Sequence, residues 1–268
     1  MRRLPAALLL TVGLLPALAA CSAVPGTGRS QLVFLSPAQE MNLGAEAYEQ
    51  MLAEEAILTR GADAEMVARI GARIAAAAEE LYPNSSAKDF AWEFKLIDDP
   101  DMVNAWALPG GKCAVYSGLL PVTGDEDSLA VVMGHEVAHA IARHGAERMS
   151  HSVVLQGALV GAAISTRKMD SEERMAVMAA LGIGSQVGVM LPFSRSHESE
   201  ADELGLYLAA YAGYDPRASI GLWERMGANG GARPPEWLST HPSEQTRIKR
   251  LRGHMPKALG YYEQSQQR

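Results

Sequence analysis

Two histidines and a glutamate occur within the short run His135-Glu136-Val137-Ala138-His139. On a helix, residues four apart lie on the same face, so His135 and His139 can present imidazole nitrogens to one tetrahedral Zn²⁺. Glu136 can then accept a proton from a zinc-bound water and pass it to a leaving amine. This spacing predicts hydrolysis of a peptide bond.

The surrounding sequence favours a helix through these positions. Thr123 and Glu126 have the spacing of a capping box. Apolar residues continue at helix-compatible intervals through the histidines, at Leu129, Val132, Met133, Val137, Ala140 and Ile141. Three fixed positions can match by chance, but two imidazoles and a carboxylate on an apolar helix are costly to bury without a partner. The context therefore favours a metal site over a chance match.

Two histidines leave a zinc site incomplete, so a further ligand is expected. A histidine six residues after His139 would indicate the metzincin arrangement, but that position is Gly145, and the glycine expected at 142 is Ala142. His144 is near, yet five residues beyond His139 it is expected to have turned away from the metal face. We interpret His144 as a helix-end residue beside Arg143, and we expect the ligand from a later segment.

That segment is a second predicted helix over residues 193–212. Glu198 and Asp202 are four apart and share a face with Gly205, whose small size would let this helix approach the first one closely. Glu198 would complete a His/His/Glu set and leave the fourth position for water, while Asp202 would orient a ligand imidazole. Glu200 is expected on the opposite side. The alternative is an ordinary solvated, acidic helix start, in which carboxylates favour the N-terminal dipole.

Several motifs together resemble a known family. The run 135–139, followed by Glu-Ser-Glu-Ala-Asp at 198–202, resembles the gluzincin zinc metallopeptidases grouped with HtpX and the CAAX prenyl endopeptidase. Residues 104–111 and 239–243 resemble two further segments of that family, and the similarity covers roughly residues 36–252. It is strongest to periplasmic lipoprotein members such as LoiP, and to the catalytic domain of BepA without its tetratricopeptide array.

The resemblance implies a zincin-like metallopeptidase domain of the α+β class. Such a domain is mostly helical, with a small mixed β-sheet and an edge-strand hairpin beside the active-site helix. The resemblance also implies one Zn²⁺ per chain, held by His135, His139 and Glu198. Glu136 would be the general base and Asp202 the supporting carboxylate.

Residues 104–120 have the pattern of a hairpin with a turn at Pro109-Gly110-Gly111. An edge strand beside the zinc could hold an extended peptide by backbone pairing. In the family this strand is thought to bind substrate, so Asn104 and Ala105 are candidate substrate-binding residues. A hairpin that merely completes the sheet is an equal alternative.

His241 lies just before Pro242, at the predicted start of another helix. In relatives the corresponding histidine is reported to cap the metal or lie close to it. The resemblance therefore implies that His241 is either an inhibitory fourth ligand or a catalytic residue that stabilises the oxyanion. The alternative is a structural histidine at a helix start.

The first twenty residues have the organisation of a bacterial lipoprotein signal peptide. Arg2 and Arg3 give a positive start, residues 8–15 are apolar, and small residues precede Cys21. Cys21 would become the lipidated N-terminus and anchor the protein to a membrane. Because Ser22, rather than an Asp that resembles an inner-membrane retention signal, follows it, we expect the bacterial outer membrane, on its periplasmic face.

Charge and cysteine content narrow the possible partners. The formal net charge of −7 becomes −9 without residues 1–20, which contain two Arg and no acidic residue. An acidic protein of this kind is a poor nucleic-acid binder. Once Cys21 carries lipid, the second cysteine, Cys113, has no disulfide partner and is expected to be a small buried hydrophobe.

The chain divides into a signal peptide (1–20), a tether from lipidated Cys21 (21–35), a zinc metallopeptidase domain (36–260) and a C-terminal tail (261–268). Within the domain, helices are predicted over 36–53 and 63–81 and a strand over 90–97. The runs 152–164 and 175–191 are apolar but shorter than the ~20 residues that cross a bilayer. Buried helices are expected there, packed over the cleft or resting against the membrane surface.

Two function classes follow. The first is a zinc-dependent endopeptidase that cuts unfolded or misassembled cell-envelope proteins by Glu-assisted attack of a zinc-bound water, with envelope assembly machinery as a candidate partner. The alternative is a lipoprotein chaperone or assembly factor that retains the metal site but acts mainly by binding clients. Glu136 favours the enzyme, because a protein that only binds has no need of a base there.

Overall fold

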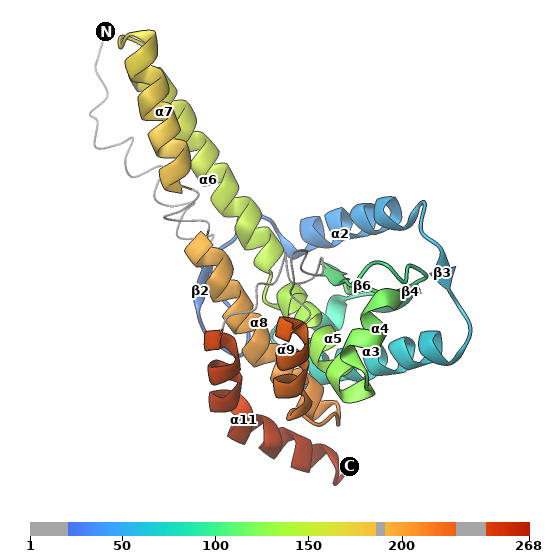
Figure 1. The fold of residues 1–268 in the computed structure, drawn as a ribbon. Coiled ribbons are helices and arrows are strands. Elements are labelled where there is room, and N and C mark those ends of the chain that lie inside the picture. The colour runs from blue at the N-terminus through green and yellow to red at the C-terminus, as the bar shows by residue number, and fades with distance from the viewer. Residues whose placement is uncertain (1–20, 186–190, 229–244) are drawn as a thin grey trace.

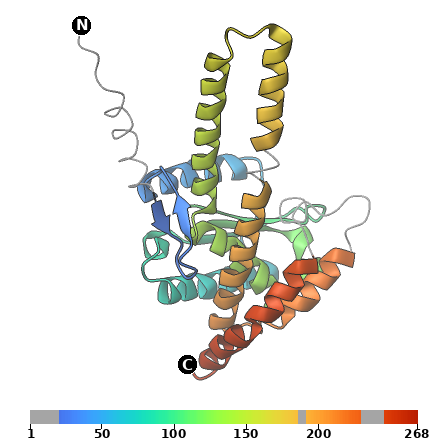
Figure 2. The same ribbon diagram turned by 90° about the vertical axis from the view of Figure 1, so that its left-hand side faces the viewer.

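A small mixed sheet, surrounded by helices, forms the body of the protein in the computed structural model, which describes residues 21–185, 191–228 and 245–268 (Figure 1). Two further helices form a hairpin that projects from this body, as the turned view makes plain (Figure 2). The predicted α+β class, mostly helical with a small mixed sheet, is confirmed.

The sheet has the strand order β3-β4-β6-β5. At its centre, β4 (Glu93–Ile97) and β6 (Lys112–Tyr116) pair in parallel. The short β3 (Ile57–Leu58) pairs antiparallel with β4, and β5 (Ala105–Leu108) pairs antiparallel with β6. The predicted hairpin is therefore confirmed as β5 and β6, and β5 forms one edge of the sheet.

The turn of this hairpin lies against a helix. Gly110 and Gly111 have φ angles of 88° and 80°, in the left-handed region that favours glycine. The predicted first helix is α2 (Pro37–Leu52), and its Gly44 lies so close to the carbonyl oxygen of Pro109 that a side chain there would collide with it. The absence of a side chain at Gly44 thus lets α2 pack directly against the hairpin turn.

The buried helix α5 (Glu126–Ile141) crosses the body and carries the His-Glu-His run. Its N-cap is Asp125, whose side chain accepts a hydrogen bond from the Ser128 amide at 2.7 Å. The predicted capping box starting at Thr123 is wrong, because Thr123 is the last residue of the one-turn helix α4 (Leu120–Thr123). Asp125 therefore satisfies a free amide at the start of α5.

Close packing against a second helix holds α5 in place. α8 (Leu191–Tyr211) crosses α5 at Gly134 and Gly205. A Cβ atom at Gly205 would lie 2.6 Å from the His135 backbone nitrogen, closer than real Cβ atoms approach. The expectation that Gly205 permits a close approach of the two helices is confirmed. On other sides, α3 (Ala62–Leu81) packs against α5 and against β4.

The remaining elements complete the body. α9 (Ala218–Ala228) packs on α5, and α11 (Gln245–Ser265) packs along α8. Near the N-terminus, β1 (Cys21–Ala23) and β2 (Ser30–Leu32) form a small hairpin of their own, and the apolar Val24 in the connection between them is buried. Two 3-10 turns lie at Ala87–Asp89 (η1) and Ser117–Leu119 (η2).

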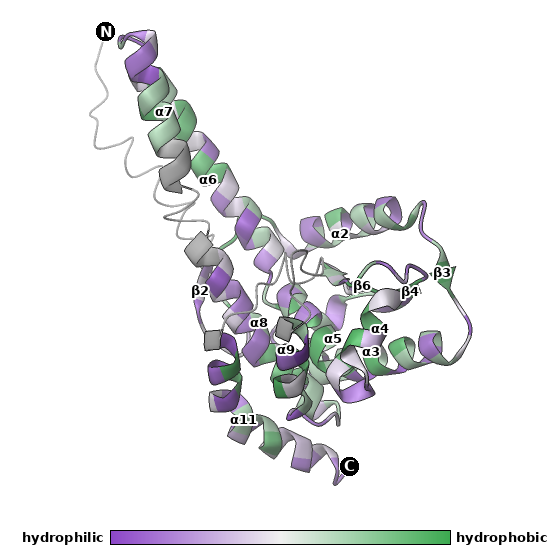
Figure 3. Ribbon diagram, viewed as in Figure 1, coloured by the Kyte–Doolittle hydropathy of each residue, from purple (hydrophilic) through white to green (hydrophobic). Residues whose placement is uncertain are grey.

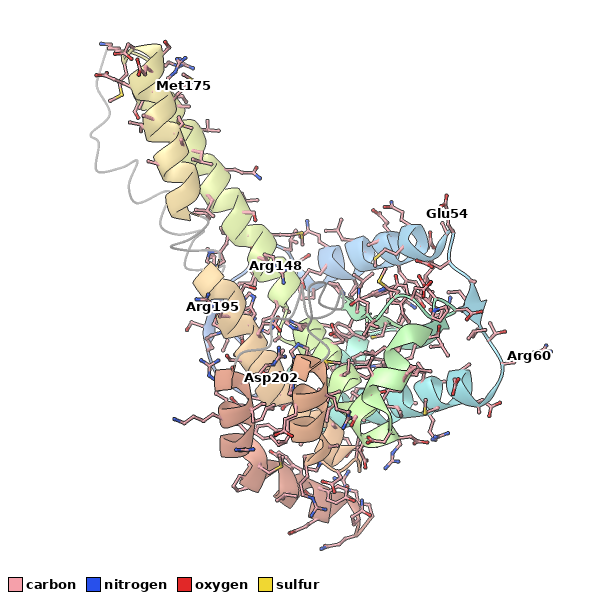
Figure 4. The ribbon with its side chains drawn as sticks, in the orientation of Figure 1. Glu54, Arg60, Arg148, Met175, Arg195 and Asp202 are labelled. Atoms are coloured by element: carbon pink, nitrogen blue, oxygen red, sulfur yellow. The ribbon has the colours of Figure 1, made fainter. Side chains whose placement is uncertain are left out.

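The projecting hairpin consists of α6 (His144–Ser165) and α7 (Ser171–Ser185). Helices were expected over 152–164 and 175–191, and the described part of both runs is helical, but their predicted burial is wrong, because α7 and the outer part of α6 extend beyond the body (Figures 1 and 3). Met175, labelled on α7 in Figure 4, is 65% exposed. Other exposed apolar side chains are Val153, Val154, Val160 and Ile164. No helix in the described part of the chain is sufficiently long and apolar to cross a membrane.

Candidate metal centre and substrate cleft

Three side chains meet where α5 and α8 touch. The Nε2 atoms of His135 and His139 lie 3.1 Å apart, and each lies 3.3 Å from a different carboxylate oxygen of Glu198. A tetrahedral zinc with bonds of about 2.0–2.1 Å separates its ligand atoms by roughly 3.3 Å. The three donors therefore have the spacing that one zinc ion requires, and they are the one such group among the described residues.

Asp202, labelled in Figure 4, lies on α8, one helical turn after Glu198. Its Oδ1 is 3.1 Å from His135 Nδ1, the ring nitrogen that faces away from Glu198. Arg247, on α11, donates to this Oδ1 at 2.6 Å and places its Nε 2.6 Å from Oδ2. The guanidinium stacks on the Trp223 ring at 3.6 Å from its centroid.

Arg247 is a residue of the candidate site that sequence reasoning missed. It is 4% exposed, so its charge depends on the Asp202 carboxylate for compensation. The only signal in the sequence is a charged residue next to the apolar positions of the C-terminal helix. Such a signal does not reveal which acidic group the side chain meets.

These neighbours set the charge of the cluster. Burial by itself lowers the pKa of His135, but hydrogen bonds to Asp202 and Glu198 outweigh it and raise the pKa to about 9. Burial, together with the neighbouring imidazoles of His135 and His144, lowers the pKa of His139 to about 3, and the hydrogen bond to Glu198 offsets only part of this. The pKa of Asp202 lies below its ordinary value, since Arg247 and His135 outweigh its burial. An ionised Asp202 and a neutral His139 suit a site for a divalent cation.

His144 contacts His139, contrary to expectation. Arg143, in the left-handed conformation with φ 61°, separates α5 from α6 and redirects the chain. As a result, His144 Nδ1 lies 2.8 Å from His139 Nδ1. His144 is outside the candidate ligand group, as predicted, but it packs behind His139, a contact that the prediction of one helix continuing through 144 did not include. Glu200 lies on the opposite side of α8, as expected, with its Oε2 3.0 Å from His144 Nε2.

Glu136 and two of the three candidate ligands, His139 and Glu198, line a cleft of about 560 Å³. The cleft lies between α2, the edge strand β5 and the start of α6, and both Asn104 and Ala105 line it. Its wall includes the ion pair between Arg143 and Glu40. Apolar lining comes from Leu43, Ala47, Trp106 and Met149. The structure thus brings the predicted substrate strand and the predicted base to the same cleft.

Three further sequence-based predictions concern His241 and the two cysteines. His241 and the motif at 239–243 lie outside the described residues. Lipidation of Cys21, at the start of β1, is not tested and stays a prediction. Cys113 is 5% exposed, and burial raises the pKa of its thiol, so the expected small buried hydrophobe is confirmed.

Comparison with known proteins places these features in context. The model of Peptidase family M48 matches residues 65–255. A mitochondrial metalloendopeptidase OMA1 of Schizosaccharomyces pombe is 39% identical over 65% of this chain and 50% of its own length. The OMA1 of Saccharomyces cerevisiae is 32% identical over 90% of this chain and 71% of its own length. The beta-barrel assembly-enhancing protease of Escherichia coli is 30% identical over 84% of this chain and 45% of its own length.

These findings correct two predictions. The location at the periplasmic face of a bacterial outer membrane is contradicted, because the two fungal relatives are named as mitochondrial proteins. The narrower grouping with HtpX, the CAAX prenyl endopeptidase and LoiP is not supported, whereas the broader family is. Matching motifs identify a zinc site that many subgroups share, so they do not separate one subgroup from another. The chain spans about half the length of the S. pombe and E. coli relatives.

Proposed function

Because this chain belongs to peptidase family M48, we propose that it is a zinc-dependent endopeptidase. The observation that carries the proposal is the convergence of His135, His139 and Glu198 at the ligand spacing of tetrahedral zinc, beside a cleft that Glu136 lines. Zinc is the metal of M48 metallopeptidases, and this donor set of two imidazoles and a carboxylate fits it.

In this proposal His135, His139 and Glu198 hold the zinc, which when bound would polarise the scissile carbonyl and acidify the attacking water. Glu136 accepts the proton of that water and delivers it to the leaving nitrogen. Asp202 accepts a hydrogen bond from His135 Nδ1, which keeps the lone pair of Nε2 directed at the metal position.

The substrate would lie along the edge strand β5. Asn104 and Ala105 line the cleft that also contains Glu136, so a segment paired with β5 would cross the candidate ligands. Backbone pairing requires an extended substrate segment, and it depends little on the side chains of that segment. We therefore propose that the substrates are unfolded or misassembled proteins. The name of the E. coli relative, which refers to β-barrel assembly, supports the narrower prediction that they include envelope proteins.

The direct test is digestion of casein, an unfolded substrate, by the purified protein, with and without a chelator, and by Glu136→Gln. We expect the chelator to abolish digestion, and Glu136→Gln to lower kcat/KM by about 10²–10⁴-fold because the proton acceptor is lost. Zinc content should stay at one ion per chain in Glu136→Gln, since this residue is not among the proposed ligands. The matched control is Glu224→Gln, at a side chain that is 59% exposed and outside the cleft.

A chaperone or assembly factor gives a different result in the same experiment. Such a protein would bind casein equally well with or without Glu136 and would release no peptides. Equal clearance of casein by the untreated protein, the chelated protein and Glu136→Gln would contradict the enzymatic proposal.

A further inference from the structure

A buried chain of polar groups leads away from the back of His139. His144 Nδ1 lies 2.8 Å from His139 Nδ1, and His144 Nε2 lies 3.0 Å from Glu200 Oε2. Arg29 Nε donates to the same Glu200 oxygen at 2.9 Å, and the Thr27 hydroxyl donates to the other oxygen. His144 is fully buried and Glu200 is 6% exposed. Water therefore has little access to these contacts.

The geometry allows one consistent assignment of protons along this chain. If His139 binds zinc through Nε2, its Nδ1 carries a hydrogen and donates it to His144 Nδ1. His144 is then neutral, with its own hydrogen on Nε2, and it donates to the Glu200 carboxylate. Arg29 keeps that carboxylate ionised, so each contact has one donor and one acceptor.

We propose that His144 is a positioning residue that fixes the ring of His139, and that Glu200 and Arg29 hold His144 in the orientation this requires. The inference rests on the zinc ligation proposed above. A metal-bound histidine commonly donates its second ring nitrogen to such an acceptor, which fixes both its tautomer and its orientation.

Each of the two candidate ligand imidazoles then has a hydrogen-bond acceptor behind it, but the two acceptors differ in kind. His135 faces the Asp202 carboxylate, which Arg247 holds. His139 faces a neutral imidazole, and the carboxylate lies one step further away. A carboxylate acceptor increases the basicity of its imidazole more than a neutral acceptor does, so we expect His135 to be the stronger zinc donor of the pair.

The outermost member of this chain comes from the N-terminal segment. Arg29 lies between the strands β1 and β2, and its guanidinium also donates to both oxygens of Glu147 on α6, at 2.9 and 2.7 Å. The segment predicted as a tether thus contributes a side chain that contacts α6 and α8 together. Through Glu200 and His144, this contact reaches the back of the metal centre.

The test measures zinc affinity by competition with a chromophoric chelator, together with the visible absorption spectrum of the Co²⁺-substituted protein. His144→Leu removes both hydrogen bonds, so we expect zinc to bind about 10–100-fold more weakly and the Co²⁺ bands to shift. His144→Asn can retain an acceptor near the Nδ1 position, and it should recover part of the affinity. This partial rescue, and the shifted spectrum, would not arise from a general loss of packing.

The matched control is Glu147→Gln. Glu147 is a buried carboxylate that also binds Arg29, but its ion-pair partners in the described part of the chain are Arg29, His151 and His197 rather than His144 or His139. Zinc affinity and the Co²⁺ spectrum of this variant should match those of the unsubstituted protein. Wild-type affinity in a folded His144→Leu, or an equal loss in Glu147→Gln, would overturn the proposal. If His144→Leu does not fold, wild-type affinity and spectrum in Glu200→Gln and His144→Asn together would overturn it.

The result also separates this inference from the proposed function. Failure of the unsubstituted protein to bind one zinc would refute the proposed ligand set and the positioning role with it. Normal zinc binding and casein digestion, with no effect of the His144 substitutions, would refute the positioning role alone.

Discussion

A single arginine shows how a buried charge holds the metal centre in place. Arg247 is 4% exposed and contacts both oxygens of Asp202, while its flat face lies on Trp223. Asp202 in turn contacts His135, a candidate zinc ligand. The arginine therefore acts on this ligand through the Asp202 carboxylate. Loss of one member of a buried ion pair leaves the other charge uncompensated.

We therefore expect Arg247→Met to lower the free energy of unfolding by about 3–5 kcal/mol, because the Asp202 carboxylate remains buried without its cation. The measurement is urea unfolding of the zinc-free protein, so that metal binding does not contribute. Arg217→Ala is the control, since Arg217 is 66% exposed and its ion pair with Asp215 should contribute less than about 1 kcal/mol. Equal losses in the two variants would show that the buried pair has no special role.

At the scale of elements, two glycines determine how closely the ligand-bearing helices approach. A Cβ at Gly134 would lie 2.6 Å from the Gly205 carbonyl oxygen, and one at Gly205 would lie 2.6 Å from the His135 amide nitrogen. Both obstacles are backbone atoms, which cannot rotate aside. The distance between α5 and α8 also sets the distance between Glu198 and the histidine pair, because these residues project from the same contact.

Gly205→Ala should destabilise the protein although alanine favours helices by about 1 kcal/mol over glycine. Overpacking costs typically 1–3 kcal/mol, and separating the helices should also weaken zinc binding. Thermal unfolding and chelator competition measure the two effects. Gly157→Ala, in α6, has no atom within 4 Å of the added carbon, so it should stabilise the helix by about 0.5–1 kcal/mol. A stable Gly205→Ala with normal zinc affinity would refute the close-contact argument.

Across the whole molecule, one buried ionic cluster joins segments distant in sequence. Arg29 near the N-terminus meets Glu147 of α6 and Glu200 of α8, and His197 of α8 lies 2.9 Å from Glu147. Burial alone would raise the pKa of Glu147, but its hydrogen bonds from Arg29 and His197 lower it to about 2. The cluster therefore ties the N-terminal hairpin and the base of the projecting hairpin to the body.

Because the pKa of Glu147 is lowered in the folded protein, we expect the free energy of unfolding to depend on pH in the acidic range. The folded pKa of Glu147 lies below its ordinary value of 4.5, so its contribution is fully present above about pH 4.5 and is lost as the pH falls toward 2. We expect the free energy of unfolding, measured with chelator between pH 6 and pH 3, to fall more steeply for the unsubstituted protein than for Glu147→Gln. The same pH dependence of the free energy of unfolding in both proteins would contradict the lowered pKa assigned to Glu147.

Local spacing in the sequence was sufficient to identify the core of the candidate site. His135, Glu136 and His139 could be assigned to one helix face because the helical period alone sets their geometry. The same period related Glu198, Asp202 and Gly205. Glu198 does contact both histidines, Asp202 contacts His135, and Gly205 packs against the His135 backbone. The β5–β6 hairpin was also predictable, because its turn needs glycines that adopt positive φ.

Only the tertiary structure decided which distant groups complete these local patterns. Arg247 and Arg29 are far from the histidines in sequence, and their pairing depends on how α11 and the N-terminal hairpin pack. The contact of His144 depends on one left-handed residue, Arg143, which no helical pattern reveals. The exposure of α6 and α7 depends on whether another element reaches them, and apolar composition does not contain that information. Local geometry is set by neighbouring residues, whereas burial and charge pairing are properties of the folded chain.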